Sequence, residues 1–112
     1  MGPRTQPWQH GGMADIDVTD DPQTGRFEAR VDGELAGFSE YRVRDGRIVF
    51  THTEVDDAFE GEGVGSALVR TALTRVREGE GLQVVPLCPF VKAWIDRHPD
   101  FQDLVAPGNP AS

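Results

Sequence analysis

The feature that most constrains the fold is a glycine-rich segment at which the hydrophobic period of the sequence changes. Up to Val55 apolar and polar residues alternate as in β-strands, whereas from Val64 apolar residues recur at the spacing of an amphipathic helix. The segment between them carries Gly61 and Gly63. A strand that leads through such a loop directly into a helix leaves the first N–H groups of the helix free to bind an anion, which the helix dipole also favours.

Two Asp-Gly dipeptides divide the first half of the chain into strands. Asp32–Gly33 and Asp45–Gly46 each separate alternating segments, and Asp-Gly suits a two-residue hairpin because both positions need a positive φ. The segments predicted to form an antiparallel meander are 26–31, 34–43 and 47–55. A further strand is predicted at 16–18, ahead of a turn at 22–25.

The second half predicts two helices and one more strand. A helix begins at Val64, and the apolar segment 82–88 forms a strand parallel to the last strand of the meander through a βαβ crossover. Pro89 suits the first turn of a second helix, which ends at His98–Pro99. The predicted fold class is α+β: a mixed sheet with an antiparallel β-meander, a central helix after the glycine-rich loop, a further parallel strand and a C-terminal helix.

The length of 112 residues has room for one domain. Irregular composition at both ends predicts flexible tails at 1–13 and 106–112 around a folded domain at 14–105. No apolar run is long enough to span a membrane, and the first residues do not have the pattern of a secretory signal. A cytoplasmic location is the default expectation.

Charge and cysteine usage exclude several classes of function. The formal net charge of -8 opposes nucleic-acid binding, which depends on Lys and Arg to neutralise phosphates. The acidic surface either attracts a cationic partner such as an amine or only keeps the protein soluble. Cys88 is the single cysteine, so an intramolecular disulfide is excluded. One cysteine and three scattered histidines do not form a metal site, and we predict none.

The glycine-rich loop supplies candidate pyrophosphate ligands, because glycine lets the backbone approach a phosphate closely. These candidates are Gly61, Gly63, Gly65 and Ser66. A Walker P-loop is excluded because the segment has no lysine, and a Rossmann fingerprint is excluded because the preceding strands form an antiparallel meander. A tight strand-to-helix connection that binds no ligand is the alternative interpretation.

The same loop resembles motif A of the GNAT superfamily, in which Gln/Arg-x-x-Gly-x-Gly/Ala binds the coenzyme A pyrophosphate through backbone amides. Gly63 and Gly65 match its glycines, and Glu60 stands where Gln or Arg is usual. The segments 52–55, 84–91 and 98–101 extend the likeness to the short, single-domain GNAT-like group of N-acetyltransferases. Members of that group lack the N-terminal helices that build the acceptor pocket, so the resemblance identifies the donor better than the acceptor.

The resemblance implies an N-acetyltransferase that uses acetyl-CoA as co-substrate. In the GNAT fold the strands before motif A and after its helix splay apart, and the thioester lies in the gap between them. The residues of this chain that would bind coenzyme A are Thr53, Val55, Glu60, Gly61, Glu62, Gly63, Val64, Gly65, Ser66 and Cys88. The acidic side chains in this set oppose a pyrophosphate, so binding must depend on the amides and the helix dipole.

Three residues are candidates for catalysis. Strict strand alternation places His52 and Glu54 on one face with Phe50, and Thr53 on the other. Histidine can accept an amine proton near neutral pH, and the carboxylate of Glu54 can attract a cation. Cys88 precedes a helix N-terminus, whose dipole favours the thiolate, and the resemblance implies that it lines the coenzyme A site. A half-buried histidine, a solvated carboxylate and a small buried cysteine are the alternatives without function.

The first functional hypothesis is acetyl transfer from acetyl-CoA to an amine by direct attack, with a base that removes the amine proton. In a variant of this mechanism the acetyl group passes through Cys88. The alternatives are a non-catalytic coenzyme A or acyl-CoA binding module or sensor, and a structural interaction domain without a cofactor. The expected partner is a small-molecule or peptide amine, with no nucleic acid and no membrane, for a monomer or weak homodimer.

Overall fold

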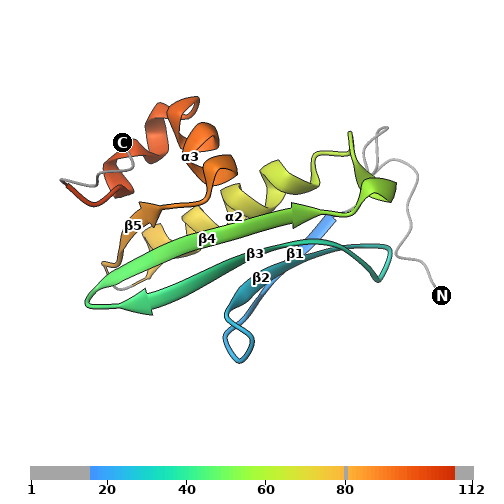
Figure 1. The fold of residues 1–112 in the computed structure, drawn as a ribbon, viewed down its shortest axis with the longest axis horizontal. Coiled ribbons are helices and arrows are strands. Elements are labelled where there is room, and N and C mark those ends of the chain that lie inside the picture. The colour runs from blue at the N-terminus through green and yellow to red at the C-terminus, as the bar shows by residue number, and fades with distance from the viewer. Residues whose placement is uncertain (1–15, 80, 108–112) are drawn as a thin grey trace.

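The computed structural model describes residues 16–79 and 81–107. These residues form one five-stranded sheet in the order β1-β2-β3-β4-β5, with a long helix running along the strands on one face (Figure 1). The predicted N-terminal tail, 1–13, lies outside the described residues, as do residues 108–112 of the predicted C-terminal tail.

The sheet has the predicted mixed topology. Its strands are β1 (Ile16–Asp21), β2 (Arg26–Val31), β3 (Glu34–Arg44), β4 (Arg47–Val55) and β5 (Gln83–Pro86). The strands β1 to β4 form consecutive antiparallel pairs along the chain, and β5 pairs parallel to β4. This topology confirms the predicted fold class. Both Asp-Gly turns have positive φ at both residues. The strand β5 is shorter than the predicted 82–88 because it ends at Pro86, whose ring nitrogen has no N–H for a ladder.

The helices are α2 (Val64–Glu78) and α3 (Pro89–Asp96), both beginning where the sequence predicts. Two 3₁₀ turns, η1 (Asp57–Phe59) and η2 (Pro99–Leu104), were not predicted. After η2 the N–H of Ala106 donates to the carbonyl of Val84 over 2.9 Å, and Ala106 is buried. Contact with the sheet therefore extends one residue past the domain end predicted at 105.

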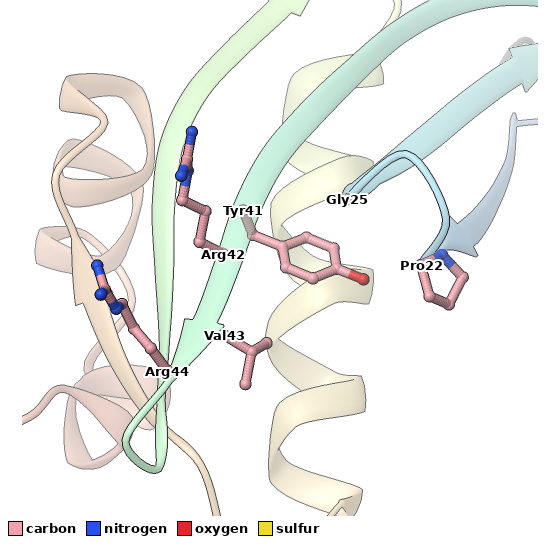
Figure 2. A pocket seen from close by; sticks show the side chains of 6 residues that line it. All are labelled: Pro22, Gly25, Tyr41, Arg42, Val43 and Arg44. Atoms are coloured by element: carbon pink, nitrogen blue, oxygen red, sulfur yellow. The ribbon is translucent and has the colours of Figure 1, made fainter.

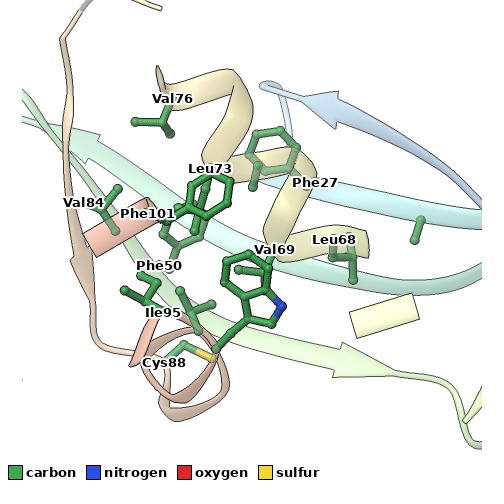
Figure 3. Packing of buried hydrophobic residues seen from close by; sticks show 14 of the residues in the cluster. Phe27, Phe50, Leu68, Val69, Leu73, Val76, Val84, Cys88, Ile95 and Phe101 are labelled. Atoms are coloured by element: carbon green, nitrogen blue, oxygen red, sulfur yellow. The ribbon is translucent and has the colours of Figure 1, made fainter. Parts of the chain in front are cut away.

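The core lies between the sheet and α2 (Figure 3). The apolar residues that define the predicted helix face are all buried: Leu68, Val69, Ala72, Leu73 and Val76. They meet Phe27 and Phe50 of the sheet, and α3 adds Trp94 and Ile95 beside them. Burial of each large apolar side chain stabilises the fold by roughly 1.5–3 kcal/mol, so this packing holds α2 firmly on the sheet. Its N-terminus is thereby fixed near the end of β4.

Candidate functional site

The candidate site is built around a gap between β4 and β5. Their pairing ends at Phe50 and Pro86, and the last link is the Cys88 N–H, which donates to the Phe50 carbonyl over 2.9 Å. The strand β4 continues to Val55, whereas the chain after Cys88 turns into α3. One edge of β4 is therefore not paired by β5 beyond Phe50, because β5 ends while β4 continues.

A β-bulge at Thr51 decides which side chains face the core on this part of β4. Phe50 lies opposite Tyr41 and His52 lies opposite Glu40, so Thr51 is an extra residue in β4. The prediction that His52 and Glu54 share a face with Phe50 was therefore wrong, because one inserted residue reverses the alternation. Beyond the bulge it is Thr53 that shares the core-facing side with Phe50, and its hydroxyl lies 3.4 Å from the buried Cys88 sulfur.

The candidates His52 and Glu54 lie on the opposite, outer face of the sheet. Their side chains are 51% and 61% exposed, and His52 Nε2 lies 2.9 Å from Glu54 Oε2. The ring centroid of Phe38 lies 6.1 Å from that of His52. Since a carboxylate can only accept, Nε2 carries the hydrogen in this bond, and Nδ1 is the ring atom left to accept a proton. His52 is thus separated by the sheet from Cys88.

The backbone of β4 presents hydrogen-bonding groups to the gap. The N–H of Asp56 donates to the carbonyl of Ala36 in β3 over 2.8 Å. Because successive residues of a strand direct their backbone groups to opposite edges, the backbone N–H and C=O groups of Glu54 also point toward β3. The N–H and C=O groups of Thr53 and Val55 therefore point to the edge that β5 leaves open, where an extended ligand could pair with them.

The N-terminus of α2 is open to an anion. Its N-cap is Gly63, with φ at 83°, and no side chain caps it. The first intrahelical bond runs from the Ala67 N–H to the Gly63 carbonyl over 3.0 Å. The N–H groups of Val64, Gly65 and Ser66 precede it and have no helical acceptor. Gly61 and Gly63 both adopt the left-handed conformation, in which an added Cβ would meet nothing within 4 Å.

Gly65 has a structural role in addition to the one that the sequence predicted. An added Cβ at this position would lie 2.7 Å from the tip of the Phe90 ring, so the glycine makes room for Phe90 between the starts of α2 and α3. The indole N–H of the buried Trp94 donates to the Ser66 hydroxyl over 2.9 Å. These contacts join α3 to the first turn of α2. Sequence reasoning missed both contacts, since no spacing in the sequence marks them.

Four carboxylates lie on the loop or beside it. Asp56, Asp57, Glu60 and Glu62 are all exposed. The Asp56 carboxylate caps η1, because its Oδ1 accepts a hydrogen bond from the Ala58 N–H over 2.9 Å. A bound pyrophosphate would thus be held by amides and the helix dipole against an opposing field.

Comparison with known families decides the classification. Residues 26–104 match the family model described as GCN5-related N-acetyl-transferase. The chain belongs to this family. The match confirms the GNAT resemblance and includes β2 to η2 of this GCN5-related chain. No curated protein matches the sequence.

A solved structure supports the fold of this GCN5-related chain. The crystal structure of ribosomal-protein-alanine N-acetyltransferase from Brucella melitensis biovar Abortus 2308 superposes with a TM-score of 0.54 at 22% sequence identity. The alignment covers 78% of this chain and 64% of that protein, so the chain spans less than two thirds of its neighbour. At this identity the likeness shows the fold alone.

A surface hollow of about 550 Å³ lies elsewhere on the GCN5-related domain, where β3 approaches its turn into β4 (Figure 2). Figure 2 shows Tyr41 and Val43 on one side of β3, with Arg42 and Arg44 on the other, so these side chains do not converge. Burial and a 2.6 Å hydrogen bond to Asp20 raise the pKa of Tyr41. The hollow is therefore a weaker candidate site than the gap.

Two further findings apply to residues 16–79 and 81–107. No cluster of three or more His, Cys, Asp or Glu side chains in this part of the chain has a geometry that could hold a metal ion. No helix there has the length and apolar character needed to cross a membrane.

Proposed function

We propose that this chain transfers an acetyl group from acetyl-CoA to an amine. The observation that carries the proposal is that the uncapped N-terminus of α2 follows the open edge of β4 after the η1 turn, with Val64 and Val55 both beside Gly37, so that one extended ligand can lie on both. The amides of Val64, Gly65 and Ser66 bind the pyrophosphate, and the backbone groups of Thr53 and Val55 bind the pantetheine arm. The thioester then reaches the gap beside Cys88.

In this proposal the acceptor approaches from the other face of the sheet. His52 and Glu54 are exposed there, at the end of β4 that borders the gap. Glu54 attracts the cationic form of the amine, which releases one proton to solvent and so gains a lone pair. Nδ1 of His52 then removes a further proton as this neutral nitrogen attacks. The acceptor class that fits is a small-molecule or peptide amine, since the outer-face residues named here are open to solvent.

A second candidate function is a coenzyme A or acyl-CoA binding module without turnover. The four carboxylates at the loop favour it, because they weaken binding of a donor whose pyrophosphate must be held by amides alone.

Binding and turnover separate these two functions. In a thermal-shift experiment with coenzyme A, acetyl-CoA, ATP and NAD, we expect only the coenzyme A compounds to stabilise the protein, by about 2.7 kcal/mol at 100 times Kd. Release of free thiol from acetyl-CoA in the presence of amines would identify the enzyme. Stabilisation without thiol release would support the binding module. Equal stabilisation by ATP or NAD, or none by coenzyme A, would contradict both.

The placement of Cys88 favours direct transfer over a covalent relay. Its side chain is only 3% exposed, its sulfur donates to Thr53, and the sheet separates it from His52. A nucleophilic thiol needs a base beside it, and the hydrogen-bond partner of the Cys88 sulfur among the described side chains is Thr53, which is not a base. We therefore expect Cys88→Ser to retain turnover within about tenfold of the wild type.

Intact-mass analysis after incubation with acetyl-CoA and no acceptor checks this expectation. We expect no hydroxylamine-sensitive acetyl group on Cys88. Lys92 is the only lysine and forms an ion pair with Asp96 at 3.2 Å, so few other sites complicate the assay. An acetyl adduct on Cys88 that passes to an added amine at the turnover rate would establish the relay instead.

A further inference from the structure

Three side chains at the gap form a hydrogen-bonded row that the sequence did not predict. The hydroxyls of Ser39 in β3 and Thr53 in β4 lie 2.9 Å apart, and the Cys88 thiol donates to the same Thr53 oxygen over 3.4 Å. Ser39 is 1% exposed and Cys88 is 3% exposed, whereas Thr53 is half-buried at the open end of β4. The central residue of the row is therefore also the one with access to the gap.

Proton counting fixes the direction of the bonds in this row. The three groups carry three protons but share two contacts, so one proton is left over. Among the described residues, the only side-chain or backbone partner of the Ser39 hydroxyl is Thr53. Leaving the proton of this buried hydroxyl without an acceptor would cost free energy, so Ser39 donates to Thr53. The thiol also donates to Thr53, because oxygen is the better acceptor.

The remaining proton then belongs to the Thr53 hydroxyl. Its oxygen accepts from Ser39 and from Cys88, which leaves its own O–H without a partner in the row. Two accepted bonds hold the oxygen in place and polarise its O–H, which strengthens it as a donor. Thr53 lies beyond the point where β5 leaves β4, so the donor is available at the gap.

We infer that the Thr53 hydroxyl donates a hydrogen bond to the carbonyl oxygen of the acyl thioester and stabilises the oxyanion formed during transfer. This assignment rests on the proposed function. The amine lone pair forms the C–N bond, and the carbonyl π electrons move to the oxygen, which the Thr53 O–H then stabilises. Collapse of this intermediate breaks the C–S bond and releases coenzyme A as the thiolate. The amine gives up one proton to the base, and the thiolate gains one from it or from water.

The direct test is the infrared carbonyl band of bound acetyl-CoA carrying ¹³C at the thioester carbonyl. A hydrogen bond to the carbonyl lowers this frequency, and we expect the low band in the wild type and in Thr53→Ser. Thr53→Val should show a band shifted to higher wavenumber while retaining the wild-type Kd for coenzyme A without an acetyl group. The same variant should lose about 10²–10³-fold in turnover, the usual effect of removing one oxyanion donor.

Ser39→Ala is the matched control, since it removes a buried hydrogen bond of the same row and loses stability by the same means. We expect it to keep the low carbonyl band, because Cys88 still donates to Thr53. A band unchanged between the wild type and Thr53→Val would overturn the Thr53 assignment alone. A low band that appears only in Ser39→Ala would show that Thr53 donates to Ser39 in the wild type, and this result would also overturn the Thr53 assignment. Failure of the wild type to bind acetyl-CoA would contradict the proposed function and the assignment together.

Discussion

Replacement of Gly63 by valine is expected to reduce the affinity for coenzyme A by at least about 100-fold, which corresponds to about 2.7 kcal/mol. Gly63 is the N-cap of α2 and has φ at 83°, a conformation that a β-branched residue adopts only with strain. Valine must either keep this φ at a cost or rotate away from it, and rotation redirects the N–H groups of Val64 and Gly65. Its branched side chain also enters the open space in front of these amides. Calorimetry with coenzyme A measures the effect.

The chain offers a matched control for backbone strain. Gly46 has φ at 76°, an added Cβ there would also meet nothing within 4 Å, and it lies in the turn between β3 and β4, away from the loop. We expect Gly46→Val to lose comparable stability, about 1–3 kcal/mol, while the folded fraction binds coenzyme A normally. Unchanged affinity in Gly63→Val would remove the α2 N-terminus from the donor site. Equal losses of affinity for coenzyme A in both variants would assign the effect to general destabilisation.

The sheet could be predicted from the sequence because its signals are local. Both hairpins depend on Asp-Gly pairs, whose positive φ values the structure reproduces, and each pair fixes the ends of two strands at once. The start of α2 was equally clear, because the hydrophobic period changes at Val64. Local signals of this kind need no knowledge of the tertiary structure.

The face of the sheet on which each catalytic candidate lies could not be predicted, because it depends on a single bulged residue, Thr51. Nothing in the segment around Thr51 distinguishes a bulge from regular strand, yet the bulge exchanges the faces of His52 and Thr53. The same limit applies to the row of Ser39, Thr53 and Cys88. Its members come from three separate segments, and only the register of β3 on β4 brings the two hydroxyls together.

Replacement of His52 by alanine is expected to lower turnover by about 10²–10⁴-fold, the usual contribution of a general base. The structure supports this role through position, because the imidazole is on the outer face at the end of β4, with Nε2 engaged by Glu54 and Nδ1 free to accept a proton. The Kd for coenzyme A should not change, since the donor binds from the other face. Turnover measured as thiol release with an amine acceptor, together with calorimetry, gives both quantities.

Chemical rescue distinguishes a base from a residue that only maintains the fold. The His52 side chain is 51% exposed, so free imidazole can enter the vacated position, and we expect it to restore part of the turnover of His52→Ala. His98→Ala is the control, because the His98 ring stacks on Trp94 at 3.6 Å and bonds its carbonyl, which is a packing role. That variant should lose stability without any response to imidazole. If His52→Ala keeps wild-type turnover, the amine must lose its proton to water or to Glu54, and the outer-face carboxylate becomes the group to replace next.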